Sequence, residues 1–300
     1  MPNVSIIIPV FNRAALLAET LESVIAQTHR DWECVVVDDG STESLDFVRR
    51  VDDRVRLIRQ ASTGVSVARN RGIVNSAGEL VAFIDSDDLW LPHQLESLVS
   101  ALKGNPQAGM CYSTHGVILP SGERVMGRPE VRPRLTYADM LTRGVPLTST
   151  LMVRRSCLGL VGIFDPTMPI SEDTDLLLRI AYQFPVAYTP ECGVLYRIHS
   201  GNSSRNFRNV YRTLMNLAEK HRIAAVARGQ RENIAAAGQM AGFWRGHLGV
   251  QAFDAARESL RTRQYRRFLA DLARAFAWAP GYTARCTLGW PLARRRPRRT

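Results

Sequence analysis

The sequence predicts an α/β fold with a doubly wound, mostly parallel sheet, followed by a helical and basic C-terminal extension. Over about the first 110 residues, short apolar runs alternate with stretches whose apolar residues have helical spacing. The apolar runs carry hydrophobic residues at successive positions, as strands do when helices cover both faces of a parallel sheet. After residue 204 the chain becomes rich in Ala, Leu and Arg, and its charge changes sign.

The predicted strands and helices of the first part alternate regularly, which implies right-handed βαβ units. The strands are VSIIIPV (4–10), ECVVVDD (33–39), RVRLI (54–58), ELVAFID (79–85) and AGMCYS (108–113). The helices are expected over 14–27, about 43–51, 64–76 and 92–103.

The pattern is weaker after residue 113. GVILPSGERVMG is expected to form a hairpin, because Ser121-Gly122 separates two apolar stretches. STLMVRR (149–155) is a further candidate strand, and GVLYRIHSGNSS (193–204) a strand that runs into a polar turn. SEDTDLLLRIAYQ (171–183) has an apolar helical face and begins with Ser171, a residue able to cap a helix. Beyond residue 205 we expect helices throughout.

The two parts of the chain differ in charge. Residues 1–204 contain 19 Lys+Arg and 23 Asp+Glu, a net of −4, whereas residues 205–300 contain 20 and 5, a net of +15. The chain ends in ARRRPRRT. Such a segment suits an anionic partner, either a membrane leaflet or nucleic acid, and it is equally typical of a solvated, disordered end.

The cysteines and the hydropathy pattern indicate a cytoplasmic protein. The five cysteines are odd in number, scattered and without a CxxC pair, which argues for a reducing compartment and against both disulfides and a zinc site. No apolar run reaches the roughly 18 residues expected of a transmembrane helix. The opening MPNVSIIIPV has no basic stretch before its apolar run, so we expect no secretory signal.

Polar and acidic residues gather where the predicted parallel strands end. The first strand is followed by Phe11-Asn12, the second by Asp39-Gly40-Ser41, and the fourth by Ser86-Asp87-Asp88. In sheets of this class ligands bind beyond the carboxyl ends of the strands. We therefore expect a ligand site along this edge.

Three carboxylates follow the fourth strand within four positions and repel one another: Asp85, Asp87 and Asp88. Clustered carboxylates can bind a divalent cation, pair with basic groups or form an acidic phosphoacceptor pocket. Asp85 and Asp87 project to the same side of an extended chain, and their hard oxygen atoms suit Mg²⁺ or Mn²⁺. The alternative is a solvated turn whose aspartate caps the helix that Pro92 begins.

Six segments in order resemble the family 2 glycosyltransferases of GT-A fold. They are VSIIIPVFNR, VVVDDGSTE, GVSVARNRGI, GELVAFIDSDDLWLP, SEDTDLLLRI and YRIHSGNSS. The resemblance covers about residues 3 to 204. It implies a glycosyltransferase domain over 1–204, with a nucleotide-binding half at about 1–113 and an acceptor half at about 114–204, and leaves 205–300 as an Arg-rich extension. It also implies an inverting enzyme that uses a nucleotide-diphosphate sugar and a divalent cation, Mg²⁺ or Mn²⁺.

The resemblance assigns the donor to residues along the predicted edge. Asp39 matches the family residue that accepts a hydrogen bond from uracil N3–H, so UDP is the favoured nucleotide. Arg69 would offer its fork of donors to the diphosphate. The residues assigned to the donor or its surroundings are Pro9, Val10, Phe11, Asp39, Arg69, Asn70, Asp85, Ser86, Glu172 and Arg197.

The resemblance also implies a cation site and a base. Asp87 and Asp85 match the metal-binding DxD, with His199 near the metal and diphosphate. Asp173 matches the second residue of the family's ED pair and lies at a helix N-terminus, which favours its ionised form, so it is assigned as the general base. The role of Asp88 stays open among a metal water shell, a sugar contact and a helix cap. Trp90 could line the acceptor pocket or pack against a helix.

Members of the family often act on lipid-linked or cell-envelope glycans, so a glycan or lipid-linked acceptor is expected. Arginines and aromatic residues alternate after residue 264, which suits peripheral binding to the inner face of a membrane; a helical cap packed on the catalytic domain is the alternative. Two other classes of protein are possible. One is a phosphoacceptor receiver domain, which requires a lysine at the end of a late strand, and the other is a non-enzymatic protein that binds anionic surfaces or nucleic acid. No recognised nucleic-acid motif supports the latter.

Overall fold

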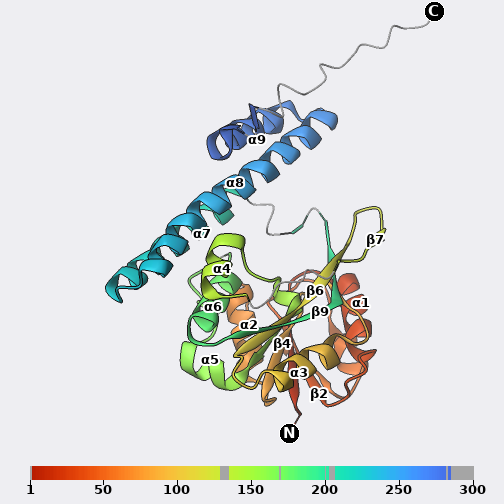
Figure 1. The fold of residues 1–300 in the computed structure, drawn as a ribbon. Helices are drawn as coiled ribbons and strands as arrows, with labels where there is room; N and C mark the ends of the chain where they lie inside the picture. Colours follow the sequence, from red (N-terminus) through yellow and green to blue (C-terminus); the bar gives the residue numbers. More distant parts are fainter. Residues whose placement is uncertain are drawn as a thin grey trace, which may run out of the picture. The chain divides into compact units, whose positions relative to one another are not determined.

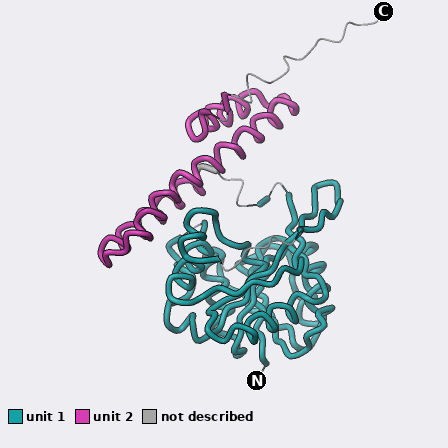
Figure 2. Tube along the Cα trace, viewed as in Figure 1, with its two compact units in different colours: residues 1–205 teal, residues 206–300 magenta. Residues whose placement is uncertain are grey.

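The apolar run at residues 4–10 forms β1 (Val4–Val10), an interior strand whose seven residues are all buried. In the computed structural model the described residues are 2–128, 135–168, 170–199, 201–202, 207–281 and 283–284. The chain divides into two compact units, residues 1–205 and 206–300, which Figure 2 colours separately. The first unit contains the sheet and the second is helical (Figure 1).

The elements of the first unit follow the predicted alternation through its first half. Figure 1 labels most of them. They are β1, α1 (Ala14–Ile25), β2 (Trp32–Asp38), the 3₁₀ helix η1 (Asp46–Arg50), β3 (Val55–Arg59), α2 (Val65–Val74), β4 (Leu80–Phe83), β5 (Leu89–Trp90), α3 (Gln94–Gly104), β6 (Met110–Ile118), β7 (Arg124–Val125), α4 (Tyr137–Arg143), the 3₁₀ helix η2 (Thr148–Thr150), β8 (Leu151–Arg154), α5 (Arg155–Val161), α6 (Glu172–Gln183) and β9 (Val186–Arg197).

The sheet has the strand order β3-β2-β1-β4-β8-β6-β9-β5, and β7 pairs with β6. Strands β3, β2, β1 and β4 are parallel, as are β6 and β9, whereas β8 runs antiparallel to both of its neighbours. The predicted α/β class with a helical C-terminal region is confirmed. The parallel strands β1 to β4 belong to the half of the domain predicted to bind the nucleotide. Antiparallel pairs are formed by strands from the second half of the unit, such as β8.

Alternate residues of β1 face opposite layers of helices. Ile6 and Ile8 belong to a buried cluster that also contains side chains of α1 and α3, such as Leu17 and Leu98. Ile7 points to the other face, where its side chain lies against Gly72 of α2 so closely that a Cβ there would be 2.4 Å from it. A glycine at this position therefore permits the close approach of α2 to the sheet.

Three local predictions were inexact or wrong. The expected helix over 43–51 is a short 3₁₀ helix, η1. Strand β9 begins at Val186, seven residues before the predicted start, and its pairing with β6 continues past register shifts on either side of Thr114. Ser171 precedes α6 but makes no side-chain cap; its backbone is left-handed, with φ of 60°.

The second unit contains α7 (Phe207–Ala227), α8 (Arg231–Arg261) and α9 (Tyr265–Trp278). Helices α8 and α9 share a small buried cluster of Ala252, Phe253 and Ala275. The rings of Tyr211 and Trp278 stack with centroids 5.0 Å apart and join α7 to α9. Among the residues that the structure describes, no helix combines the length and the apolarity needed to cross a bilayer.

Candidate active site

The carboxyl ends of β1, β2 and β4 meet at one edge of the sheet, because the three strands are parallel neighbours. There they border a cavity of about 320 Å³. All of the predicted donor residues except Asn70 and Arg197 line it. The full lining is Pro9, Val10, Phe11, Arg13, Asp39, Val65, Ala68, Arg69, Asp85, Ser86, Ile170 and Glu172.

Asp39 is held rigidly at the edge of this cavity by the start of α2. Its Oδ1 accepts hydrogen bonds from the Thr63 backbone and the Gln60 amide, both at 2.8 Å, and its Oδ2 accepts one from the Gly64 backbone at 2.9 Å. Gly64 takes a φ of +99°, which favours glycine. The neighbouring Asp38 holds the turn itself, because its Oδ1 accepts the Ser41 N–H at 2.8 Å.

Arg69 joins three segments of the chain through two ion pairs. Its Nη1 lies 2.5 Å from Glu172 and its Nη2 lies 2.7 Å from Asp85. Burial lowers the pKa of Arg69, but the Asp85, Glu172 and Asp173 carboxylates raise it above its ordinary value overall. Burial, and then Asp173, raise the pKa of Glu172 despite the opposing effect of Arg69. Arg69 is thus a fixed cation in the lining of the cavity.

The three carboxylates that follow β4 do come together, with one oxygen of each within 4.8 Å of the others. Asp87 Oδ2 accepts hydrogen bonds from Arg13 at 2.6 Å and from His199 at 2.8 Å. Asp85 Oδ1 pairs with Arg69. Within the described ranges no hydrogen bond reaches Asp85 Oδ2 or Asp87 Oδ1. This set of hard oxygen atoms fits Mg²⁺ or Mn²⁺.

Asp88 has a different task from its two neighbours. Its Oδ2 accepts a hydrogen bond from Ser149 at 2.5 Å and its Oδ1 accepts one from the Arg197 backbone at 3.0 Å. Burial raises the pKa of Asp88 well above its ordinary value, and the Asp85 and Asp87 carboxylates add to the effect. Asp88 therefore ties β9 to the acidic loop, and it does not cap the next helix.

The two predicted donor residues outside the cavity serve the framework around it. Asn70 exchanges two hydrogen bonds with the backbone of Phe164, at 2.8 and 2.9 Å. Arg197 donates from Nε to the Asp87 carbonyl at 2.9 Å and pairs with Glu19 at 2.7 Å. Trp90 is buried and donates to the Ser149 carbonyl at 2.8 Å, so of its two predicted roles the structure favours packing.

His199 has a defined arrangement of its two ring nitrogens. Its Nδ1 accepts the Gly201 backbone N–H at 3.1 Å, so in this arrangement Nε2 carries the proton and donates it to Asp87. His199 would ligate a cation through Nε2 only after losing that proton.

Asp173 lines a second cavity, of about 170 Å³, together with the three carboxylates that follow β4. Its Oδ2 accepts a hydrogen bond from Thr148 at 2.9 Å and its Oδ1 accepts the Thr174 backbone N–H at 2.6 Å. The two cavities share Arg13 and Asp85. The lining of the second is Arg13, Asp85, Asp87, Asp88, Leu147, Thr148, Ser149, Asp173, Tyr196 and Asn202.

Sequence reasoning gave no role to five polar residues that line the two cavities: Arg13, Thr148, Ser149, Tyr196 and Asn202. Arg13 follows the first strand directly, and this position was the one available signal for it. Thr148 and Ser149 belong to η2, in the stretch where the sequence pattern was weak.

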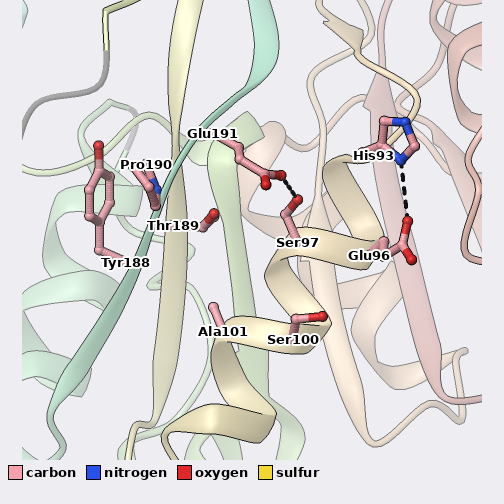
Figure 3. A pocket seen from close by; sticks show the side chains of 9 residues that line it. All are labelled: His93, Glu96, Ser97, Ser100, Ala101, Tyr188, Thr189, Pro190 and Glu191. Atoms are coloured by element: carbon pink, nitrogen blue, oxygen red, sulfur yellow. Dashed lines mark hydrogen bonds and ion pairs between the residues drawn. The ribbon is translucent and has the colours of Figure 1, made fainter.

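A further hollow, of about 340 Å³, lies beside α3 and β9 and is shown in Figure 3. Glu191 accepts a hydrogen bond from Ser97 there, and His93 lies 3.2 Å from Glu96 on the exposed side of α3. It contains none of the predicted site residues. The acidic edge of the sheet is thus the site that both the sequence and the structure support.

The fold and this site correspond to a known family. The family described as Glycosyl transferase family 2 matches residues 5–158, and the chain belongs to it. A glycosyltransferase from Nostoc sp. (strain PCC 7120), alr2836, is 30% identical over 96% of this chain and 89% of its own length. The enzyme class predicted from the sequence is therefore confirmed. This outcome favours the enzyme over both rivals, the receiver domain and the non-enzymatic binder.

Two further comparisons are informative. WfgD of Escherichia coli, a UDP-Glc:alpha-D-GlcNAc-diphosphoundecaprenol beta-1,3-glucosyltransferase, is 30% identical over 46% of this chain and 54% of its own length. The crystal structure of S. aureus TarS 1-349 in complex with UDP-GlcNAc has a TM-score of 0.62 and 16% identity, covering 92% of this chain and 91% of that one. The TarS likeness confirms the GT-A fold.

We predict that Arg69→Met destabilises the protein by about 3–5 kcal/mol, because it leaves Glu172 and Asp85 without their buried partner. The measurement is urea unfolding followed by circular dichroism. The double variant Arg69→Met with Glu172→Gln should recover part of the loss. Arg143→Met, which removes an exposed pair to Asp139, is the control and should cost less than about 1 kcal/mol. Equal effects of Arg69→Met and Arg143→Met would contradict the role given to Arg69.

Proposed function

We propose that this glycosyltransferase moves a sugar, with inversion, from a UDP-sugar to a hydroxyl of a glycan or lipid-linked acceptor. A divalent cation at Asp85 and Asp87 would assist, and Asp173 would act as the base. The observation that carries this proposal is that the two cavities adjoin through Arg13 and Asp85. Residues assigned to the donor line one, and Asp173 lines the other.

The nucleotide side of the proposal is supported by Asp39. Its carboxylate is held by three short hydrogen bonds and still borders the cavity, where it can accept an N–H from a base. Phe11, exposed at the end of β1, offers a ring for stacking. The UDP-sugar in the name of WfgD and the UDP-GlcNAc bound to TarS 1-349 agree with a uridine donor.

Asp85 and Asp87 are the residues that would hold the cation, with His199 as a third candidate. A bound Mg²⁺ or Mn²⁺ would supply positive charge that offsets the negative charge of the departing diphosphate. Asp85 Oδ2 and Asp87 Oδ1 support this assignment, because no hydrogen bond from the described residues reaches them. Arg69, which pairs with Asp85, would add a second, fixed positive charge near the diphosphate.

Asp173 is placed to receive a proton from an acceptor hydroxyl. It lies in the first turn of α6, near the positive end of the helix. Thr148 and the Thr174 backbone orient its two oxygens. The hydroxyl, losing its proton to Asp173, attacks the anomeric carbon directly, and the diphosphate leaves from the opposite face. No covalent enzyme intermediate is needed.

The second unit would hold the enzyme at the anionic surface of the inner face of a membrane. This location suits a lipid-linked acceptor. The segment 205–300 has a net charge of +15. On α9 the exposed apolar residues Tyr265, Leu269 and Phe276 fall within about 40° of one another around the helix axis. Arg266 borders this stripe, an arrangement that suits an interface of anionic lipids.

Titration of UDP into the protein by calorimetry tests the donor and cation assignments. We expect binding in Mn²⁺, at least about tenfold weaker binding in EDTA, and a similar loss for Asp87→Asn in Mn²⁺, because the bridging charge is removed. Asp53→Asn, at an exposed site, is the control. UDP binding that is independent of both Mn²⁺ and Asp87 would contradict the cation site and leave the donor site standing.

Asp173→Asn should lower kcat by about 10²- to 10⁴-fold, the usual contribution of a general base, while UDP affinity stays within about twofold. Sugar release from radiolabelled UDP-sugars, with a panel of glycan and lipid-linked acceptors, measures the first quantity and calorimetry the second. Glu96→Gln, on the exposed part of α3, serves as the control carboxylate. Retention of full transfer by Asp173→Asn would rule out its role as base.

Vesicle sedimentation tests the membrane assignment. The protein should bind vesicles containing phosphatidylglycerol more tightly than those of phosphatidylcholine alone. The double variant Leu269→Ser with Phe276→Ser should bind about tenfold less tightly, because two apolar side chains no longer enter the interface. Val74→Ser, which removes an exposed apolar residue from α2, is the control. Equal affinities of the double variant and the unaltered protein, or preference for RNA over vesicles, would contradict the assignment.

A further inference from the structure

Arg13 stands between the two cavities and contacts both the acidic loop and the region after β9. Its Nη1 lies 2.6 Å from Asp87 Oδ2, and its Nη2 donates to the Gly201 carbonyl at 3.2 Å. It lines the donor-side cavity and the Asp173-side cavity alike. None of the motifs that indicated the function assigned it a role.

The two arginines of the site are held very differently. The Arg69 side chain is 4% exposed and has a carboxylate on each of its two Nη atoms, so it is fixed. The Arg13 side chain is 31% exposed, and within the described part of the chain its one ion pair is to Asp87. A partly exposed side chain that makes one ion pair and one long hydrogen bond to a carbonyl, and that borders a cavity on each side, can change partners at low cost.

We infer that Arg13 is a counter-ion that exchanges partners during the reaction, an inference that rests on the proposed function. In the donor-free enzyme its guanidinium neutralises Asp87. When Asp87 takes a divalent cation, Arg13 leaves it and transfers its fork of donors to the donor diphosphate in the adjoining cavity.

Charge and geometry support this exchange. Asp87 Oδ2 already accepts hydrogen bonds from both Arg13 and His199, so a cation at this carboxylate meets a guanidinium of the same sign. The two cavities are open to the same side chain, so the guanidinium has a new site within reach. A planar guanidinium matches phosphate oxygens in a bidentate manner, which makes the diphosphate a better partner than one shared oxygen.

The exchange has a thermodynamic consequence that distinguishes it from a static role. Without donor, Arg13 competes with the divalent cation for Asp87. With donor present, the same residue strengthens binding of the diphosphate. Removing Arg13 should therefore change cation affinity and donor affinity in opposite directions, whereas loss of a purely structural contact would weaken both.

The test compares Arg13→Gln and Arg13→Lys with the unaltered protein and with Arg56→Gln. Arg56 is half exposed and pairs with Glu33 at 2.7 Å at the opposite edge of the sheet, so it is a matched control. Mn²⁺ binding without nucleotide is measured by electron paramagnetic resonance, and UDP binding at saturating Mn²⁺ by calorimetry. Thermal unfolding checks that each variant is folded.

For Arg13→Gln we expect Mn²⁺ affinity to rise by about two- to fivefold, the range for a partly exposed ion pair. UDP affinity should fall by about ten- to a hundredfold, as for loss of a charge-assisted hydrogen bond. Arg13→Lys should restore part of the UDP affinity, because it keeps the charge without the fork. Arg56→Gln should change neither quantity.

The outcomes separate this inference from the proposed function. If the unaltered protein binds Mn²⁺ and UDP, but Arg13→Gln leaves both affinities unchanged or weakens both, the exchange is overturned and the cation-assisted donor site stands. If the unaltered protein binds neither Mn²⁺ nor UDP, the proposed function fails and this inference fails with it.

Discussion

Repulsion among the carboxylates that follow β4 is the constraint on which the rest of the site depends. Asp85, Asp87 and Asp88 lie within reach of a single ion, and each is compensated in a different way. Arg69 pairs with Asp85, and Arg13 and His199 pair with Asp87. Asp88 is buried between Ser149 and the Arg197 backbone, and its raised pKa shows how costly its charge is there. These partners come from the turn between β1 and α1, from α2, from η2 and from the end of β9 and the residues after it, so compensating the acidic loop also fixes the edges of both cavities.

Arg69 links the donor side of the site to the residue proposed as base. Its second carboxylate, Glu172, is the first residue of α6, and Asp173 is the next. The chain enters this helix through a left-handed Ser171, a conformation that costs energy in a residue other than glycine. Two interactions stabilise this start of the helix. Glu172 anchors the first turn to Arg69, and the positive end of the helix favours the two adjacent acidic residues. Asp173 is thereby held at a fixed distance from the donor-side cavity.

The sequence predicted the strands and their carboxyl ends well, because buried parallel strands leave unbroken apolar runs, as at residues 4–10 and 33–39. It also predicted that Asp39, Arg69 and Asp85 lie at one ligand site, and all three line the same cavity. It could not separate residues that line the cavity from those that brace it, since spacing does not give the direction of a side chain: Asn70 holds the Phe164 backbone and Arg197 braces the Asp87 carbonyl. Arg13 was missed because a single arginine at the start of a helix has no distinguishing pattern.

The mixed topology explains why two cavities meet at the same carboxylates. Parallel strands place only their carboxyl ends at the ligand edge, so β1, β2 and β4 supply the donor-side residues. Strand β8 is antiparallel to β4, and its start is therefore at that edge. The preceding η2 then brings Ser149 to the Asp85 backbone at 3.1 Å and Thr148 to Asp173 at 2.9 Å. A purely parallel sheet would direct this segment to the opposite edge. Reversal of one strand thus allows one half of the sheet to hold the proposed donor residues and the other to orient Asp173, the proposed base.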